Sequence, residues 1–404
     1  MEAYVGKQFV GIDLHRRRTV IVRTTEAGEV LEAVRIVNDV QRLASVMARA
    51  GDCPEVVLEA TYGWYWAVDA LQAGGANVHL AHPLGVKAFE YRRVKNDFRD
   101  AQDLADLLRM GRLPEAWIAP PPTRELRELV RHRAKLVGLR SRCKAEVHAV
   151  LAKCGVQVLM SDLFGVWGTE LLDGLELPAP YAARIASLRR LLDDVDFEIT
   201  VFAGIIRGRM AQEPGYTAVQ KIPGIGPTLG AVLVAEIGDI NRFASASKLT
   251  CWAGLTPKHH ESDTHVRRGR ITKQGSRLVR WAAIESVKTI SKASEVGVLR
   301  ERVADRRGRN IGSVAAARLQ LELVFYALRV NSTTKADAAE PSWIDCISSS
   351  RDMKKTPILD RSSKPQGTPP CIRRTLPTAS RTRQGKCQGL RTVETTIRVD
   401  GRVR

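Results

Sequence analysis

Residues 9–14, Phe9-Val10-Gly11-Ile12-Asp13-Leu14, decide the fold of the first part of this chain. The run is apolar except for one acidic residue near its end, a pattern typical of a buried strand. Two further β-rich stretches follow at Thr19–Thr24 and Glu29–Val37. Three strands joined by short connections predict a small antiparallel meander.

After the meander, strand-like and helical segments alternate. The predicted order is a helix at Gln41–Arg49, a strand at Val56–Glu59, a helix at Trp64–Gln72, a strand at Asn77–Leu80 and a helix from Pro83 to about Tyr91. This order predicts an α/β domain with a mixed sheet and helical layers, as in ribonuclease-H-like folds. The prolines Pro120-Pro121-Pro122 mark a boundary, so we place the first domain at residues 1–120.

The remaining chain divides into three regions. Apolar spacing predicts helices at Thr123–Lys153 and Tyr181–Met210, which within residues 121–216 form either a long antiparallel arm, binding nucleic acid or dimerising, or an ordinary core-packed pair. Residues 217–330 are expected to form a mainly helical third domain. Residues 331–404 are rich in Ser, Thr, Pro, Arg and Lys without a sustained apolar period, so we expect a basic disordered tail.

The charge balance favours a polyanionic partner. The chain has 63 Lys and Arg against 44 Asp and Glu, a formal net charge of +19. Because neutralising phosphates releases condensed counterions, nucleic acid is the leading candidate. A membrane surface would require an amphipathic anchor or an apolar span of about twenty residues, and we expect neither in this sequence.

Cysteine usage and the N-terminus bear on the compartment. The seven cysteines are scattered and form no C-x-x-C pair, which argues against a disulfide framework and against a zinc ribbon. Residues 1–7 have no apolar signal core. We therefore expect a cytoplasmic protein.

Four acidic residues are candidates for one metal site. Asp13 and Glu59 fall at the ends of two predicted strands, and Asp97 and Asp100 begin a predicted helix, where residues three apart share a face. Clustered carboxylates repel one another, and divalent cations such as Mg²⁺, which prefer hard oxygen ligands, relieve that repulsion. Two such ions can stabilise the attacking and leaving oxygens of a phosphoryl transfer.

Spacing alone does not choose the helical pair. Asp103 and Asp106 continue the same period, so either could replace Asp97 or Asp100. An acidic residue after a strand is often a turn former, and one at a helix start is often a cap. These alternatives stay open on the residues alone.

A second constellation lies downstream. Residues 221–227, Lys-Ile-Pro-Gly-Ile-Gly-Pro, precede an apolar helix at Thr228–Ile237, which is the arrangement of a helix-hairpin-helix element that binds a DNA phosphate through its backbone. The alternative is a Gly-rich turn between two packed helices. Ser262 is, on local sequence alone, an ordinary loop serine. The residues that we predict to bind DNA are Pro223, Gly224, Ile225, Gly226, Lys258, Arg267, Arg268, Arg270 and Lys273.

These motifs resemble those of one transposase family. The matching strings are Gly11-Ile12-Asp13, Leu58-Glu59-Ala60-Thr61, Lys95-x-Asp97-x-x-Asp100-Ala101, Ala253-Gly254-Leu255-Thr256-Pro257 and Glu261-Ser262. They are similar to the motifs of bridge-RNA-guided insertion-sequence transposases, which have an Asp-Glu-Asp-Asp, RuvC-like N-terminal domain and a serine-containing C-terminal domain. The resemblance extends from Gly11 to Trp281, and Thr61-Tyr62-Gly63 departs from the family's usual Thr-Gly.

The resemblance implies roles for particular residues and partners. It implies that Asp13, Glu59, Asp97 and Asp100 hold Mg²⁺, as two ions and with Mn²⁺ as an alternative, and that Ser262 is a covalent nucleophile on DNA. It further implies a structured guide RNA encoded by the element, element ends and target DNA as substrates, and at least a homodimer for synapsis.

Three rival functions make different demands on the sequence. A structure-specific nuclease would use only the four carboxylates. A sugar-kinase or actin-like ATPase also opens with Gly-x-Asp, but it would need further Gly-rich phosphate loops, and none is evident. An inactive nucleic-acid-binding remnant is disfavoured because all four acids and Ser262 are present.

Overall fold

The computed structural model describes residues 4–89, 96–263 and 265–333 of the 404 in the chain. The predicted disordered tail lies outside the described residues, except for its first three residues, which end the last helix.

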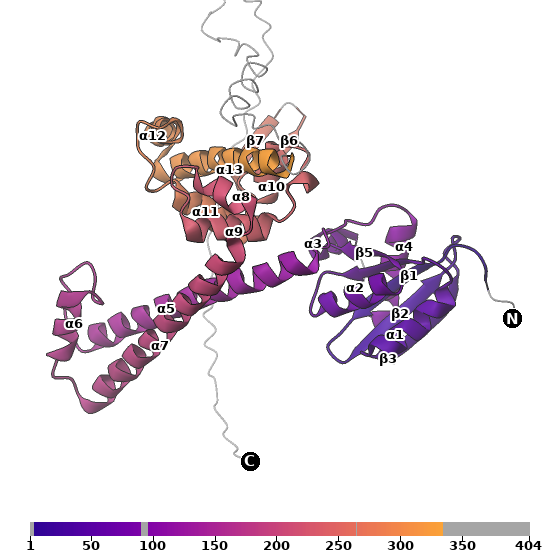
Figure 1. Ribbon diagram of the computed structural model, residues 1–404, viewed down its shortest axis with the longest axis horizontal. Coiled ribbons are helices and arrows are strands. Elements are labelled where there is room, and N and C mark those ends of the chain that lie inside the picture. Colours follow the sequence, from indigo (N-terminus) through magenta and orange to yellow (C-terminus); the bar gives the residue numbers. More distant parts are fainter. Residues whose placement is uncertain (1–3, 90–95, 264, 334–404) are drawn as a thin grey trace, which may run out of the picture. The chain divides into compact units, whose positions relative to one another are not determined.

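The N-terminal domain contains a five-stranded mixed sheet in the order β3-β2-β1-β4-β5 (Figure 1). Its strands are β1 (Phe9–Leu14), β2 (Arg18–Thr24), β3 (Val30–Val37), β4 (Glu55–Glu59) and β5 (Asn77–Ala81). The first three strands pair in antiparallel fashion, whereas β4 is parallel to both β1 and β5. The predicted meander, followed by alternating strands and helices, is confirmed.

Helices cover both faces of this sheet. They are α1 (Val40–Met47), α2 (Trp64–Ala73), α3 (Pro83–Val86) and α4 (Asp97–Arg109), with 3-10 turns η1 (Ala48–Ala50) and η2 (Lys87–Phe89). The α-helical part after Pro83 is therefore shorter than predicted. Since side chains alternate along a strand, Ile12 and Leu58 pack with α1 and α2 on one face, while Val57 packs with Leu104 of α4 on the other.

Helix α4 lies unusually close to the sheet at Gly11. A Cβ built on Gly11 would lie 1.8 Å from the carbonyl oxygen of Ala101. Ala101 and Ala105 are fully buried in this contact. The absence of a side chain at Gly11, with alanines opposite, is therefore what allows α4 to pack directly on β1.

The middle of the chain forms a helical pair with a core of its own. The pair is α5 (Pro121–Lys153) and α7 (Ala179–Met210), which lie side by side, and the short helix α6 (Val166–Asp173) lies in the connection between them (Figure 1). Three ion pairs show that they run antiparallel, because the partner number falls as the α5 number rises: Glu125 with Arg209, Arg140 with Asp196 and Glu146 with Arg184. The α6 end of the pair encloses buried Val147, Leu151 and Leu188.

The C-terminal region is mostly helical, as predicted. Its elements are α8 (Pro214–Gln220), α9 (Pro227–Ile237), η3 (Ile240–Arg242), α10 (Ala246–Trp252), β6 (Pro257–Ser262), β7 (His265–Ile271), α11 (Arg277–Ser286), α12 (Glu295–Arg307) and α13 (Arg309–Thr333). By length and composition, residues 309–331 are long and apolar enough to span a membrane, which corrects the expectation that the chain has no apolar span of this length. In this fold Ala316, Leu321 and Val324 of that helix are buried in the domain core.

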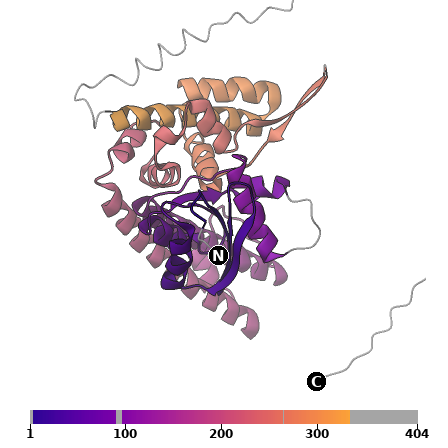
Figure 2. The same ribbon diagram turned by 90° about the vertical axis from the view of Figure 1, so that its right-hand side faces the viewer.

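The segment around Ser262 is a two-stranded antiparallel ribbon rather than the predicted loop. Ser262 ends β6 and pairs with His265 across the turn. All six residues of β6 are exposed. Figure 2 shows the ribbon extending away from the helices of its own domain. Alternation of apolar and polar residues, the usual strand signal, is missing because neither face of the ribbon is buried.

A buried carboxylate joins the helical pair to the C-terminal domain. Glu236 of α9 is 3% exposed, and its two oxygens accept hydrogen bonds of 2.7 and 3.1 Å from Arg131 of α5. The Ser276 hydroxyl, which caps α11, donates a third bond of 3.0 Å. Arg127, one helical turn before Arg131, donates to the carbonyl oxygens of residues 235 and 236. One side chain thus ties together α5, α9 and α11.

We expect Gly11→Ala to destabilise the N-terminal domain. The new methyl group would force α4 away from β1, and overpacking of this kind costs about 1–3 kcal/mol. Urea unfolding followed by circular dichroism measures the loss. Gly204→Ala is the matched control, because Gly204 is helical and no atom lies within 4 Å of the place that a Cβ would take there; an equal effect of both substitutions would contradict the close-packing argument.

We expect Glu236→Ala to lower the free energy of unfolding by about 3 kcal/mol, the lower end for a broken buried pair, because the Arg131 side chain is 38% exposed and stays partly hydrated. The same unfolding measurement applies. Glu125→Ala removes an ion pair that is exposed on both sides and should cost less than about 1 kcal/mol. Equal losses would show that Glu236 is not a structural tie.

Candidate metal centre and the exposed serine

Asp13 and Glu59 lie at the same edge of the sheet. β1 and β4 are parallel neighbours, and Ile12 lies opposite Leu58. The residues that follow these two, Asp13 and Glu59, therefore lie next to each other. Asp13 stands two residues after Gly11, and Glu59 stands two residues after Val57. Gly11 and Val57 face α4. Because every second residue of a strand points to the same face, Asp13 and Glu59 also point to the α4 face. Both are half-buried and line one open cavity of about 550 Å³.

The first turn of α4 supplies the other two predicted acids. Asn96 caps the helix by accepting a hydrogen bond from the Phe98 amide, which fixes where the helix begins. Asp97 and Asp100 follow in the first turn, and both are half-buried. The contact at Gly11 holds this turn above the carboxyl end of β1.

The structure brings three side chains within coordination distance of one point. His15 Nε2 lies 3.1 Å from an Asp13 carboxylate oxygen and 3.5 Å from one of Asp97. The candidate ligand atoms of these residues lie within 4.8 Å of one another. Arg35 approaches the second oxygen of Asp97 at 3.5 Å. Two hard carboxylate oxygens and one imidazole nitrogen suit a divalent cation.

Sequence reasoning missed His15. A signal was available, because His15 stands two residues after Asp13, and residues two apart in an extended chain share a face. Glu59 belongs to the same cavity as Asp13 and His15, whereas Asp100 belongs to the helical turn of Asp97. The structure thus brings Asp13 and Asp97 together, with Glu59 in the same cavity as Asp13 and Asp100 in the same helical turn as Asp97.

The other two acids of α4 are turned away from this site. Asp103 is exposed, and Asp106 forms a 3.2 Å ion pair with Arg109. The buried side of the helix carries Ala101, Leu104 and Ala105. Asp97 lies on the same side of the helix as these residues. Each step of three residues along the helix, from Asp97 to Asp100, Asp103 and Asp106, points further away from the sheet. Asp97 is therefore on the side of α4 that faces the sheet, and Asp100 lies between that side and the side of Asp103.

The Gly-rich turn between α8 and α9 has a clear packing role. Gly224 has φ +85°, and a Cβ there would lie 2.0 Å from the Ser286 carbonyl oxygen of α11. The Pro223 carbonyl accepts a 2.7 Å hydrogen bond from the buried Gln320 side chain. Ile225 is buried, whereas Gly226 is exposed at the start of α9. The structure thus explains Gly224 by packing, and the predicted phosphate contact by this turn stays a prediction.

The ribbon presents Ser262 together with basic residues. Lys258, Arg267, Arg270 and Lys273 are exposed along or just after it, and the Arg268 side chain lies outside the described parts. The base of the ribbon is fixed by Arg280, which donates hydrogen bonds to the carbonyl oxygens of Ala253 and Gln274 at 2.9 and 2.6 Å. Ser262 is thus held on an anchored but uncovered element.

Two regions of this chain match families of transposases. Residues 10–155 match a family described as transposase, of the DEDD type of IS110, and residues 216–303 match a family described as "Transposase IS116/IS110/IS902 family". Together these regions cover more than half of the chain.

Three relatives illustrate the similarity. The transposase for insertion sequence element IS1111A of Coxiella burnetii is 22% identical over 363 residues, which cover 82% of this chain and 92% of the relative. The insertion element IS116 uncharacterized 44.8 kDa protein of Streptomyces clavuligerus is 25% identical over 389 residues, covering 80% and 94%. The transposase for insertion sequence element IS1328 of Yersinia enterocolitica is 24% identical over 281 residues, covering 67% and 82%.

The fold, the acidic centre and these similarities define a DNA transposase, an enzyme of insertion sequences. The chain belongs to the IS110/IS116/IS902 family of transposases.

Asp13→Asn and Asp97→Asn should each weaken Mn²⁺ binding at least about ten-fold, the loss expected when one ligand-shell group is removed. Isothermal titration calorimetry on the purified chain measures the affinity. Asp103→Asn, on the exposed side of α4, is the matched control and should bind as the unaltered chain does. Unchanged binding in both test variants would remove these residues from the metal centre.

Proposed function

We propose that this chain cuts and rejoins DNA strands with a divalent-metal centre on Asp13, Glu59, Asp97 and Asp100 and with Ser262 as the nucleophile. The observation that supports it best is the meeting of Asp13 and Asp97 within coordination distance, beside Glu59, at the sheet edge covered by α4. Mg²⁺ is the ion that we assign, as a pair of ions, with Mn²⁺ as the substitute. The order of strands and the positions of the acids also support a RuvC-like, ribonuclease-H-like domain.

The chemistry of the proposed reaction is a phosphodiester exchange. The Ser262 Oγ forms a bond to phosphorus, the bond from phosphorus to one deoxyribose oxygen breaks, the hydroxyl proton is lost to water and the released oxygen takes one up. Attack of the released hydroxyl of another strand reverses the step and frees Ser262. Bound divalent ions would supply charge stabilisation to the attacking and leaving oxygens.

The residues of this chain contribute position and charge to that exchange. Gly11 and Asn96 set the height and the start of α4, and so the place of the carboxylates. Exposed Lys258, Arg267 and Arg270 flank the serine and suit the DNA backbone. An exposed ribbon is the kind of element that can enter a second molecule's active site, which supports a homodimer or larger assembly for synapsis.

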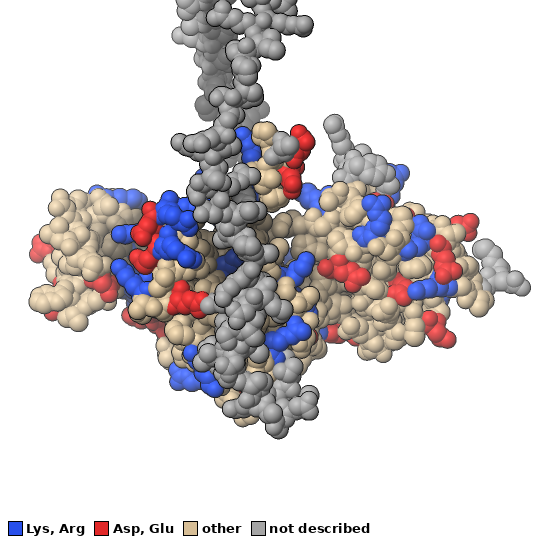
Figure 3. Space-filling view, turned by 90° about the horizontal axis from the view of Figure 1, so that it is seen from above, with Lys and Arg blue, Asp and Glu red and all other residues tan. Residues whose placement is uncertain are grey.

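Nucleic-acid binding by the rest of the chain is proposed on charge and geometry. The net charge of +19 supports an extended phosphate-binding surface. On the face that Figure 3 shows, Lys and Arg side chains lie in several groups with Asp and Glu between them. Such a distribution suits a structured guide RNA bound along the molecule, together with the start of α9, at Gly226, as a helix-hairpin-helix phosphate contact.

A metal-dependent nuclease that uses only the carboxylates is the second candidate. It is favoured by one observation: among the described residues, the acidic centre is assembled from the sheet, the residues that follow β1 and β4, and α4, without a residue of the ribbon. The two candidates differ in what they require of Ser262.

Ser262→Ala should abolish strand exchange and the covalent protein–DNA product, because no other atom replaces Oγ. The measurement is excision of the native element from its flanking DNA in cells, read by sequencing of junctions, together with denaturing gels for DNA-linked protein. Ser247→Ala, an exposed serine elsewhere in the same domain, should retain activity.

The outcomes separate the candidates. Loss of exchange in Ser262→Ala and in Asp97→Ala supports the serine recombinase. Exchange that persists in Ser262→Ala but disappears in Asp97→Ala leaves the carboxylate nuclease. Persistence in both variants would contradict each of them.

A further inference from the structure

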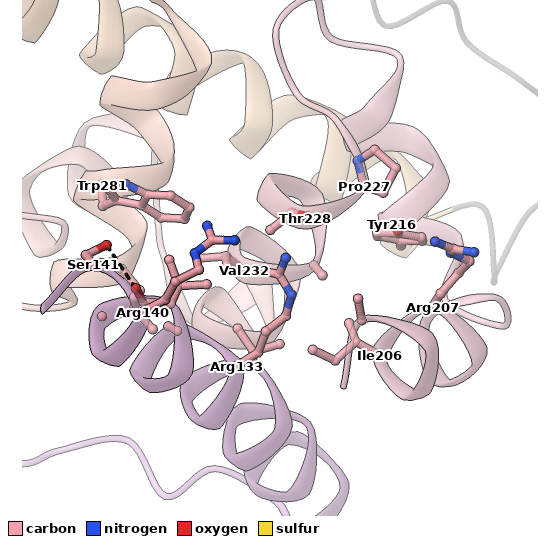
Figure 4. A pocket seen from close by; sticks show the side chains of 17 residues that line it. Arg133, Arg140, Ser141, Ile206, Arg207, Tyr216, Pro227, Thr228, Val232 and Trp281 are labelled. Carbon is pink, nitrogen blue, oxygen red and sulfur yellow. Dashed lines mark hydrogen bonds between the residues drawn. The ribbon is translucent and has the colours of Figure 1, made fainter. Parts of the chain in front are cut away.

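A second cavity of about 500 Å³ lies where the helical pair meets the C-terminal domain, apart from the metal centre. Helices α5, α7, α8, α9 and α11 all contribute to its wall. Its volume falls within the range of about 300–1,000 Å³ that is usual for small-molecule sites. Figure 4 shows the side chains that line it.

The wall combines an apolar floor with aromatic rings. Val130, Ile206 and Val232 are buried beneath the cavity. Tyr216 and Trp281 border it from α8 and α11, and Trp281 is 41% exposed. A half-exposed indole above an apolar floor is a surface on which a planar ring can stack.

The charges of the wall are all positive. Arg133 and Arg140 of α5 and Arg207 of α7 line the cavity, and no Asp or Glu does so in the parts that the structure describes. Arg140 is already paired with Asp196 at 2.9 Å. The Nε of Arg133 is buried and has no hydrogen-bond partner among the described residues. Burial and the nearby Arg140 lower the pKa of Arg133.

A buried guanidinium nitrogen without a hydrogen-bond partner is costly, and an anion relieves that cost. Helix α9 adds to the attraction, because its first turn, at Pro227 and Thr228, borders the cavity without a side-chain cap. Backbone amides at a helix start bind phosphate. The cavity therefore suits a ligand that has a planar apolar part and a phosphate.

We propose that this cavity holds one unpaired nucleotide of single-stranded nucleic acid, with its base against Trp281 and its phosphates on Arg133 and Arg207. The inference rests on the proposed function only in that nucleic acid is the expected polyanion. A base that is paired and stacked within a duplex has no free face for Trp281, so the nucleotide is extruded or lies in a single-stranded segment. An apolar protein segment is disfavoured because it leaves the arginines unpaired.

The test measures binding rather than recombination. Fluorescence anisotropy of labelled twelve-residue oligouridylate and oligothymidylate, and of a duplex of equal length, is followed with the full chain. Trp281→Leu and Arg133→Gln should each weaken single-strand binding about ten-fold, the change that corresponds to about 1.4 kcal/mol. Arg133→Gln should also lower the salt dependence by about one phosphate contact.

Two matched controls are available in the same chain. Trp167 of α6 is 78% exposed, and Arg142 of α5 is exposed and absent from the cavity wall. Trp167→Leu and Arg142→Gln should bind within about two-fold of the unaltered chain. If they lose as much as the test variants do, the cavity is not the binding site.

Crosslinking gives a readout that does not depend on substitutions. An oligonucleotide with one 5-iodouracil, irradiated with the unaltered chain, should label the peptide that contains Trp281, and labelling confined to other peptides would overturn the proposal. Equal losses of duplex and single-strand binding in the test variants would also overturn it. A stronger response of RNA or of DNA identifies the source of the nucleotide, and either supports the site.

The outcome of the binding test can be distinguished from the outcome of the strand-exchange test. Single-strand binding that depends on Trp281 in a chain without strand exchange would keep the cavity proposal and remove the recombinase. Strand exchange in a chain whose cavity variants bind normally would do the reverse.

Discussion

The direct contact between Gly11 and Ala101 is the constraint on which the acidic centre depends. Backbone meets backbone there with no side chain between, so α4 cannot slide or tilt without a clash. The strand then fixes Asp13, and the helix start fixes Asp97. Asp13 and Asp97 are 84 positions apart in the sequence, and they become neighbours because Gly11 has a hydrogen atom where other residues have a Cβ.

Much of this arrangement could be predicted from the sequence, and the reason is periodicity. The runs at β1 and β4 are short and apolar, and each has an acidic residue at its end. If the two strands pair in parallel, these acidic residues are predicted to lie at the same edge of the sheet. His15 was missed although its spacing from Asp13 was visible, because a lone histidine carries little information before its neighbours across the chain are known. The choice of Asp97 and Asp100 over Asp103 and Asp106 depended on family resemblance. The structure adds a physical reason, which is the direction in which α4 faces the sheet.

Other features were not accessible to sequence reasoning. The ribbon at residues 257–271 has no apolar alternation, since nothing covers it. The turn at Gly224 has the local sequence of a phosphate-binding hairpin, yet the contact that explains its glycine is the Ser286 carbonyl oxygen, about sixty residues further on. The cavity beside Trp281 is built from five helices and leaves no local pattern at all. In each case the deciding partner is distant in sequence.

The uncovered ribbon that carries Ser262 has a consequence for timing. A two-stranded hairpin standing alone is marginally stable in water, so contact with a partner molecule would stabilise the ribbon. A partner that binds only one conformation of the ribbon has a lower apparent affinity, in proportion to the fraction of molecules that are in that conformation. In the proposed recombinase, the reactivity of Ser262 would then depend on assembly with a partner. Such an enzyme would cut DNA only within the assembled complex, which would protect the host chromosome from the single molecule.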